Sequence, residues 1–535
     1  MKPANEEVLP YLPGSREKES LKATISRMKS EVIDIPLIID GQEVRTGNTA
    51  ECVIPHNHKH VLATYHMAGP KEMEMAIESA LQAKKEWEAL PWEHRLAVFL
   101  KAAELIGEGW RNTLNGATML GQSKTACEAD ADSACELMDF FRYNVYFARK
   151  IMEEQPAGVK GVLNRMEYRP LEGFVLAVTP FNFTAIGGNL PTSPAMAGNT
   201  IIWKPASTAI YSNYYVMKLL EEAGLPAGVI NFVPGPGKVI GPLAMAHPML
   251  AGIHFTGSTA TFNSMWRTIA ENLENYRSYP RIVGETGGKD FLFAHASADV
   301  RAMVSAIIAG GFSYQGQKCS ATSRVYIPRS IWPESRELLL EELQDLKVGE
   351  VENFTNYMGA VIDRNSFDNI VSYINYAKDS REAEIIAGGS YDDSIGYFID
   401  PTVIVTTDPH FKTMKEEIFG PVVTIYVYED EQYDEALELC ETTSDYALTG
   451  SIFARDRKAI VEIEAKLGYS AGNLYINDKT TGAFVGLQPF GGSRASGTNE
   501  KVGSKQNISR WMSPRTIKES FNPATDYRLP CMREA

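Results

Sequence analysis

Gly173-Phe-Val-Leu-Ala-Val-Thr-Pro-Phe-Asn-Phe183 is the stretch of sequence that decides the fold. Its apolar run from Phe174 to Val178 is typical of a strand covered on both faces in a parallel sheet. After it we expect a helix of small residues ending near Gly198 and a helix at 210–222, with strands at 200–203, 229–233, 252–255 and 281–284. Strands that alternate with helices in this way predict βαβ units and a doubly wound sheet.

The alternation continues after residue 285 and predicts a second α/β domain. Here we expect helices at 300–310 and 334–346 and strands at 323–327, 422–427 and 451–453. Toward the N-terminus, residues 35–66 predict short strands and turns, and apolar residues three and four positions apart predict helices within 71–150. Residues 159–168 and the tail beyond Trp511 fit neither domain, so we expect an arm used in contacts between subunits.

Size and composition indicate an ordinary globular protein with more than one domain. At 535 residues the chain is too long for one hydrophobic core, and its 44% hydrophobic and 22% charged residues are typical of soluble proteins. A net charge of −15 argues against nucleic acid or an anionic membrane as the partner. The apolar runs are far shorter than a membrane span.

The six cysteines are scattered and form no C-x-x-C pair, so we expect neither a metal site nor a disulfide framework. Residues 1–30 lack the apolar core of a signal peptide, and their acidic residues count against a transit peptide. We therefore expect a cytoplasmic protein. The mitochondrial matrix is the alternative if a transit peptide has been removed.

Polar residues and glycines follow the predicted strands of the first sheet, where ligands bind in open α/β folds. Gly257 and Ser258 open a helix whose N-terminal amides suit an anionic group, and a plain N-cap is an equal alternative. Gly237 belongs to a G-x-G-x-x-x-G pattern that differs from the usual dinucleotide spacing, so an ordinary turn explains it equally well. The full row comprises Asn182, Lys204, Gly235-Pro-Gly237, Gly257-Ser258 and Glu285.

Cys319 lies in a small polar stretch, Gly316-Gln-Lys-Cys-Ser320, just before a predicted strand. The glycine and the neighbouring Lys318 predict open, electropositive surroundings that favour a thiolate. A single cysteine is more often buried and inert. A single carboxylate such as Glu285 is more often a surface group before a turn. These ordinary explanations weaken when the two residues are considered as a pair.

The segment Glu285-Thr-Gly-Gly-Lys-Asp290, with Cys319 34 positions after Glu285, resembles the catalytic pair of the aldehyde dehydrogenase superfamily. Further blocks occur in the order of that family over about residues 173–497. They are Thr179-Pro-Phe-Asn182, Trp203-Lys-Pro205, Phe255-Thr-Gly-Ser258, Glu417-Ile-Phe-Gly-Pro421 and Pro489-Phe-Gly-Gly492. The resemblance implies an α/β fold with a Rossmann-like NAD-binding domain, a second α/β catalytic domain and a small oligomerisation arm.

On this fold we expect six segments. Residues 1–158 supply N-terminal strands and helices of the NAD-binding domain, and 159–172 part of the arm. Residues 173–290 form the Rossmann-like core, 291–485 the catalytic domain, and 486–510 a return to the NAD-binding domain. Residues 511–535 form a C-terminal oligomerisation segment. The resemblance implies a homodimer or a higher homo-oligomer.

The resemblance also implies the roles of the catalytic and cofactor residues. Cys319 attacks the aldehyde, Asn182 holds the oxyanion, and Glu285 activates the water that hydrolyses the thioester. Cofactor contacts are implied for Lys204, Ser207, Gly237, Gly257, Ser258, Glu417 and Phe419. Many NAD-preferring relatives carry glutamate where this chain has Ser207. Serine removes the repulsion of a 2′-phosphate, so both NAD and NADP are candidate cofactors.

Several blocks are similar to the branch of the superfamily that oxidises L-glutamate γ-semialdehyde, the open form of delta-1-pyrroline-5-carboxylate. They include residues 180–190, 316–321 and 476–482. The resemblance implies that the amides of Gly482 and Ala483, with the Ser320 hydroxyl, bind the substrate carboxylate. It places Phe183 and Phe490 about the aliphatic chain, for which ordinary core packing is the alternative. Glu136 either guards the entrance or meets the ammonium group, unless it lies on a solvated helix face.

Three other functions remain as alternatives. One is another semialdehyde dehydrogenase, for instance one for succinate semialdehyde, which an arginine for the distal carboxylate would favour. The second is a cysteine-dependent esterase or acyl transferase without redox chemistry. The third, a structural relative without activity, conflicts with the joint presence of Asn182, Glu285 and Cys319.

Overall fold

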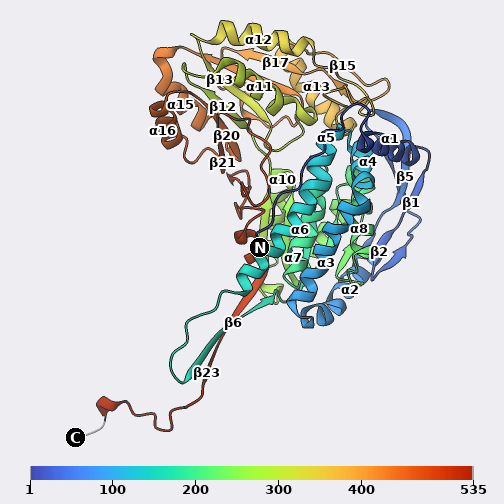
Figure 1. Ribbon diagram of the computed structural model, residues 1–535, viewed down its shortest axis with the longest axis vertical. Helices are drawn as coiled ribbons and strands as arrows, with labels where there is room; N and C mark the ends of the chain where they lie inside the picture. Colours follow the sequence, from blue (N-terminus) through green and yellow to red (C-terminus); the bar gives the residue numbers. More distant parts are fainter. Residues whose placement is uncertain (1, 533–535) are drawn as a thin grey trace.

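The computed structural model describes residues 2–532 and contains two α/β domains with a protruding two-stranded arm (Figure 1). The predicted ranges 1–158 and 511–535 include residue 1 and residues 533–535, which lie outside the described residues. Within the described chain, no helix is both long enough and apolar enough to cross a membrane.

The first domain is built on a seven-stranded sheet of order β11-β10-β7-β8-β9-β2-β3. Five strands run parallel, β2 pairs antiparallel with β9, and β3 pairs antiparallel with β2. Strand β7 lies between β8 and β10, so the chain builds outward from it in both directions, and this junction is the switch point at which such sheets bind ligands. The strands are β7 (Phe174–Val178), β8 (Thr200–Lys204), β9 (Ile230–Phe232), β10 (Leu250–Thr256), β11 (Arg281–Glu285), β2 (Leu37–Ile39) and β3 (Gln42–Val44).

Helices cover both faces of this sheet, which is why β7 is apolar at nearly every position. Phe174 and Leu176 pack into one core, and Val175 and Ala177 pack into the core on the opposite face. The first face is covered by α2 (Pro70–Ala89), α9 (Gly237–Met245) and α10 (Thr259–Glu271). The second is covered by α3 (Trp92–Leu105), α4 (Arg111–Gln122), α6 (Glu136–Met152), α7 (Thr184–Met196) and α8 (Ile210–Glu222).

Before this sheet the chain forms a short helix and a smaller sheet of order β1-β5-β4. These elements are α1 (Arg16–Lys29), β1 (Ile33–Ile35), β4 (Thr49–Ile54) and β5 (Asn57–His66). Helix α1 packs on α4 through Leu21, Ile25 and Met28. The predicted short strands and the helices of residues 71–150 are therefore confirmed.

The second domain contains a seven-stranded sheet of order β14-β17-β18-β13-β12-β20-β21, parallel except for β14. Its strands are β12 (Asp290–Ala294), β13 (Thr322–Pro328), β14 (Ala383–Ala387), β17 (Thr402–Thr406), β18 (Val422–Tyr428), β20 (Thr449–Phe453) and β21 (Asn473–Ile476). Its main helices are α11 (Val300–Phe312), α12 (Trp332–Gln344), α13 (Arg364–Lys378), α15 (Tyr433–Thr442) and α16 (Arg457–Lys466).

The sequence did not predict β12, which lies near the middle of this sheet between β13 and β20. Strand β11 ends at Glu285 and β12 begins at Asp290, so the chain passes from one sheet to the other with no helix between them. Strands and helices do not alternate at this point, so the sequence pattern gave no sign that a new strand follows β11 directly. Strands β14, β17 and β21 and helices α13, α15 and α16 were also not predicted.

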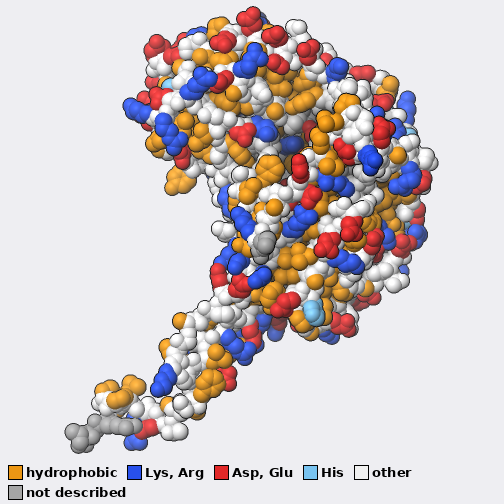
Figure 2. Space-filling view, in the orientation of Figure 1, with side chains coloured by type: hydrophobic (Ala, Val, Ile, Leu, Met, Phe, Trp, Pro, Cys, Tyr) orange, Lys and Arg blue, Asp and Glu red, His pale blue; other side chains and the backbone are white. Residues whose placement is uncertain are grey.

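The arm consists of β6 (Val162–Pro170) and β23 (Met512–Ser520), paired antiparallel over their whole length. This confirms that the two stretches outside the domains come together. Figure 1 shows the arm projecting from the first domain, and Figure 2 shows hydrophobic side chains exposed along it. They include Leu163, 44% exposed, and Phe521, 61% exposed.

Candidate active site

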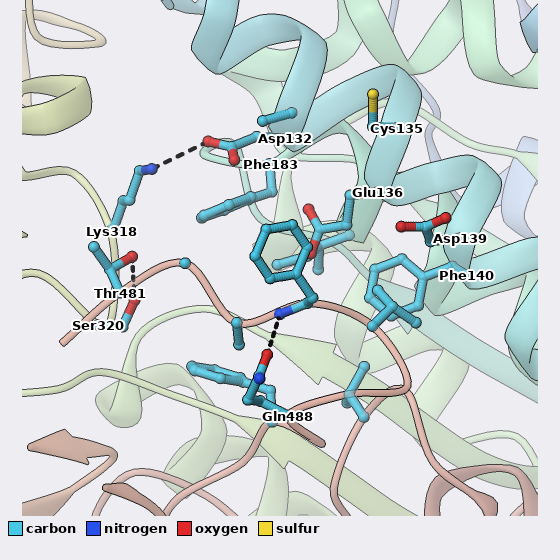
Figure 3. A pocket seen from close by; sticks show the side chains of 18 of the residues that line it. Asp132, Cys135, Glu136, Asp139, Phe140, Phe183, Lys318, Ser320, Thr481 and Gln488 are labelled. Atoms are coloured by element: carbon cyan, nitrogen blue, oxygen red, sulfur yellow. Dashed lines mark hydrogen bonds and ion pairs between the residues drawn. The ribbon is translucent and has the colours of Figure 1, made fainter. Parts of the chain in front are cut away.

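A cavity of about 180 Å³ is lined by residues from both domains and contains Cys319 and Glu285 together. The helix α6 and the turn before it form one side, and a loop after β21 forms another (Figure 3). All six predicted substrate residues line the same cavity. They are Glu136, Phe183, Ser320, Gly482, Ala483 and Phe490.

Cys319 lies in a tight turn between α11 and β13. Gly316 has a φ of +64°, and a Cβ there would lie 2.2 Å from the Gly420 carbonyl oxygen, so only glycine fits. The buried Gln315 side chain donates to the Ser123 and Ala360 carbonyl oxygens at 3.0 and 2.8 Å. These contacts fix the backbone just before Cys319.

The predicted electropositive surroundings of Cys319 are wrong. Burial, together with the carboxyl groups of Glu285, Asp290 and Glu417, raises the pKa of the Cys319 thiol well above its usual range. The Lys318 ammonium lies 3.3 Å from an Asp132 carboxylate oxygen (Figure 3). The Lys318 charge is therefore compensated by Asp132, and Lys318 does not lower the pKa of the Cys319 thiol.

Glu285 ends strand β11, which is the edge strand of the first sheet and pairs with β10. Its Oε1 atom is buried without a hydrogen-bond partner among the described residues. Burial, with a smaller contribution from the Glu500 carboxyl, raises the pKa of Glu285 to about 8. A carboxyl with a pKa in this range can both accept and release a proton near neutral pH, as a general base requires.

Asn182 follows β7 and is buried. Its side-chain amide donates to the Gln317 carbonyl oxygen at 3.1 Å. Gln317 itself is held by a bond from the Ile362 N–H to its Oε1 atom. The amide is thus tied to the turn that carries Cys319.

Five of the seven predicted cofactor residues lie at the carboxyl ends of strands of the first sheet, and none of the seven lines the cavity that contains Cys319. Lys204 ends β8, and burial alone lowers the pKa of its ammonium to about 8. Ser207 is exposed three residues later, within hydrogen-bonding reach of the Tyr65 hydroxyl. Ser258 is the N-cap of α10, since its hydroxyl accepts from the Thr261 N–H. Gly257 precedes it, and Gly237 is the first residue of α9, so two helix N-termini lie at this edge.

Glu417 connects this edge to the catalytic pair. Its Oε1 accepts from the Gly288 N–H at 2.9 Å, and burial raises the pKa of Glu417 to about 7. A Cβ at Gly287 would lie 2.2 Å from Glu417 Oε2, so glycine is needed for this approach. Phe419 has a φ of +58°, and its ring packs edge-on against Phe181.

At the substrate end, the Ser320 hydroxyl donates to the Thr481 hydroxyl at 3.0 Å, which ties the nucleophile turn to the loop of Gly482 and Ala483. Gly482 has a φ of +99°. Glu136 lies at the start of α6, and its Oε2 is buried without a partner in the described chain. It faces the cavity and not solvent, so the alternative of a solvated helix face is wrong.

The sequence did not predict a cluster of charged residues beside Phe183. Lys124 is fully buried, pairs with Asp132, and lies 4.2 Å from the Phe183 ring centroid. Asp132 therefore balances two lysines, Lys124 and Lys318. Lys124 and Asp132 follow no predicted strand and match no motif, so the sequence offers no signal for them.

The aldehyde dehydrogenase family profile matches residues 43–517. The delta-1-pyrroline-5-carboxylate dehydrogenase of Dictyostelium discoideum is 51% identical over 99% of this chain and 96% of that protein. The human mitochondrial protein of the same name is 45% identical over 100% of this chain and 95% of its own.

A crystal structure of delta-pyrroline-5-carboxylate dehydrogenase from Mycobacterium tuberculosis, bound with NAD, superposes with a TM-score of 0.96. It is 48% identical and covers 99% of this chain and 98% of its own. The similarity extends over nearly the whole chain. The chain belongs to the aldehyde dehydrogenase family.

Proposed function

We propose that this chain is an NAD-dependent dehydrogenase that oxidises L-glutamate γ-semialdehyde, the open form of delta-1-pyrroline-5-carboxylate, to L-glutamate in proline catabolism. One observation carries the proposal. Cys319, Glu285 and the Gly482–Ala483 loop line a single small cavity of about 180 Å³. The relatives named above supply the substrate class.

Cys319 is the nucleophile in this proposal. Its thiol releases a proton to water as Sγ adds to the aldehyde carbon, and the Asn182 amide stabilises the negative charge that develops on the oxygen. Loss of hydride from the adduct leaves a thioester on Cys319. Glu285 then takes a proton from water, which attacks the thioester and releases the acid.

The residues at the sheet edge fit NAD, which accepts the hydride when it is bound. Lys204 is a buried ammonium whose pKa is perturbed by burial alone, and a ribose hydroxyl suits it. The N-termini of α9 and α10 suit the pyrophosphate. Glu417 would hold the second ribose. Ser207 carries no charge that would repel the 2′-phosphate of NADP, so the experiment below compares NAD with NADP.

The other end of the cavity suits an amino acid group. Backbone amides of Gly482 and Ala483 would receive the α-carboxylate, with Ser320 in support. Glu136 and Asp139 line the side formed by α6, where an ammonium group would meet acidic side chains (Figure 3). Phe183 and Phe490 would contact the carbon chain between the two ends.

We also propose that the β6–β23 arm pairs two or more copies of the chain, because apolar side chains such as Leu163 are exposed on it in a single copy. The six cysteines are all unpaired, which suits a reducing compartment, and mitochondrial relatives make the matrix a candidate beside the cytoplasm.

The test compares glutamate semialdehyde, succinate semialdehyde and propanal, each with NAD and with NADP. We expect kcat/KM to be highest for glutamate semialdehyde with NAD. Equal kcat/KM for succinate semialdehyde would overturn the substrate assignment. Hydrolysis of a simple ester without any reduction of nicotinamide would favour a cysteine-dependent esterase or acyl transferase.

A further inference from the structure

The first residues of the described chain form a wall of the aldehyde cavity. Residues Pro3–Leu9, called the strap below, contain no helix or strand and run beside α6 (Figure 1). Glu6 and Val8 of the strap line the cavity together with Cys319. The strap is more than 300 residues away from the nucleophile in sequence, and no motif marks it.

Asn5 fastens the strap to two separate walls. Its Nδ2 donates to an Asp139 carboxylate oxygen at 2.8 Å and to the Val485 carbonyl oxygen at 2.9 Å. Its Oδ1 accepts from the Tyr143 hydroxyl at 3.2 Å. Asp139 and Tyr143 lie on α6, whereas Val485 belongs to the loop of Gly482 and Ala483. One side chain therefore holds α6 and the substrate loop at a fixed separation.

The rest of the strap is held by charge and by backbone bonds. The Glu6 carboxylate lies 2.7 Å from Arg142 and 3.5 Å from Arg111. The Glu6 N–H donates to Asp139 at 2.8 Å, and the Leu9 N–H donates to the fully buried Asp130 at 2.8 Å. With both of its ends anchored in this way, the strap has one defined position.

The strap meets α6 beside an irregular turn. Residues Asp130–Cys135 form a π-helical turn, which places Asp132 and Glu136 toward the cavity (Figure 3). Such turns are frequent at functional sites. The side of the cavity that would receive the amino acid group is thus built from this turn, α6 and the strap.

We infer that the strap determines which aldehydes the cavity accepts, by holding α6 against the 481–488 loop and blocking the space that a longer chain would occupy. The inference rests on the proposed function for its natural substrate. Asn5 is a positioning residue, since it does not itself line the cavity and acts through Asp139 and Val485, which do.

The test replaces Asn5 by alanine in the full-length protein. Asn112→Ala is the matched control, because Asn112 bonds to Ser20 on α1 and joins the N-terminal region to α4 away from the cavity. For Asn5→Ala we expect the KM for glutamate semialdehyde to rise about 5- to 10-fold with kcat within about twofold, because the closed arrangement is less populated. The ratio of kcat/KM for octanal over propanal should rise by about the same factor.

Hydrogen exchange at the Glu6 amide, measured on the same proteins, reports whether the strap has been released. If exchange there is not faster in Asn5→Ala, the double variant Asn5→Ala/Arg142→Ala takes its place. A released strap with wild-type KM and a wild-type octanal to propanal ratio would overturn the inference. Failure of the wild type to prefer glutamate semialdehyde would refute the proposed function instead, and the octanal ratio would still decide the role of the strap.

Discussion

Replacing Glu285 by glutamine removes the ionisable group from the cavity and keeps the shape of the side chain. The Oε1 atom of Glu285 has no hydrogen-bond partner among the described residues, so few contacts are lost. General-base catalysis contributes about 10²- to 10⁴-fold, so we expect deacylation to slow by about that factor. Acylation should proceed, because the substitution also removes a carboxyl group that raises the pKa of Cys319.

The assay is the rapid appearance of reduced cofactor after mixing with aldehyde. We expect a burst of about one equivalent per active site, followed by slow turnover, because a thioester accumulates when deacylation limits the rate. A variant that shows no burst and keeps the kcat of the wild type would refute the assignment of Glu285 as the base.

The pKa of Glu285 adds a pH dependence with a definite sign. A raised pKa of about 8 means that the ionised base accumulates as the pH rises. About one tenth of the groups are ionised at pH 7 and about nine tenths at pH 9, so deacylation should accelerate about tenfold over this range. Glu500→Gln removes the neighbouring like charge and should move this rise to lower pH, and Glu285→Gln should abolish it.

Three further substitutions test the residues around the catalytic pair. Asn182→Ala removes the amide near the nucleophile turn and should slow the burst phase of the Glu285→Gln background about 10²- to 10³-fold; an unchanged burst rate would exclude the oxyanion role. Gly287→Ala places a Cβ 2.2 Å from Glu417 Oε2 and should raise the KM for NAD about tenfold or more, whereas Gly109→Ala, with open space around its Cβ, should leave it unchanged. Ser207→Glu introduces a charge against a 2′-phosphate and should raise the NAD to NADP ratio of kcat/KM about tenfold, with Ser207→Ala as the neutral control.

The first sheet was predictable because its strands obey a simple rule. A strand buried on both faces must be apolar throughout, and Phe174–Val178 fits that rule. The polar residues that follow such strands must then gather at one edge, which places Asn182, Lys204 and Glu285 without any knowledge of the coordinates. The second sheet was harder, since β12 follows β11 directly and breaks the alternation.

Two features of the site depend on contacts that a local pattern does not contain. Lys318 beside Cys319 suggested an activated thiol. In the structure the Lys318 ammonium forms an ion pair with Asp132, which is distant in sequence. The strap reaches the cavity through Asn5, whose partners lie on α6 and in the 481–488 loop. Long-range pairs of this kind depend on the tertiary fold, and the local sequence around each residue does not predict them.

The most direct test of the central claim is the mass of the Glu285→Gln protein, quenched in acid soon after mixing with NAD and glutamate semialdehyde. Acid keeps the substrate amine protonated, so the amine cannot displace the thiol. We predict a γ-glutamyl group on the peptide that contains Cys319 and none in the Cys319→Ala protein. An unmodified Cys319 after reduced cofactor has formed, or an acyl group on another residue, would contradict the mechanism.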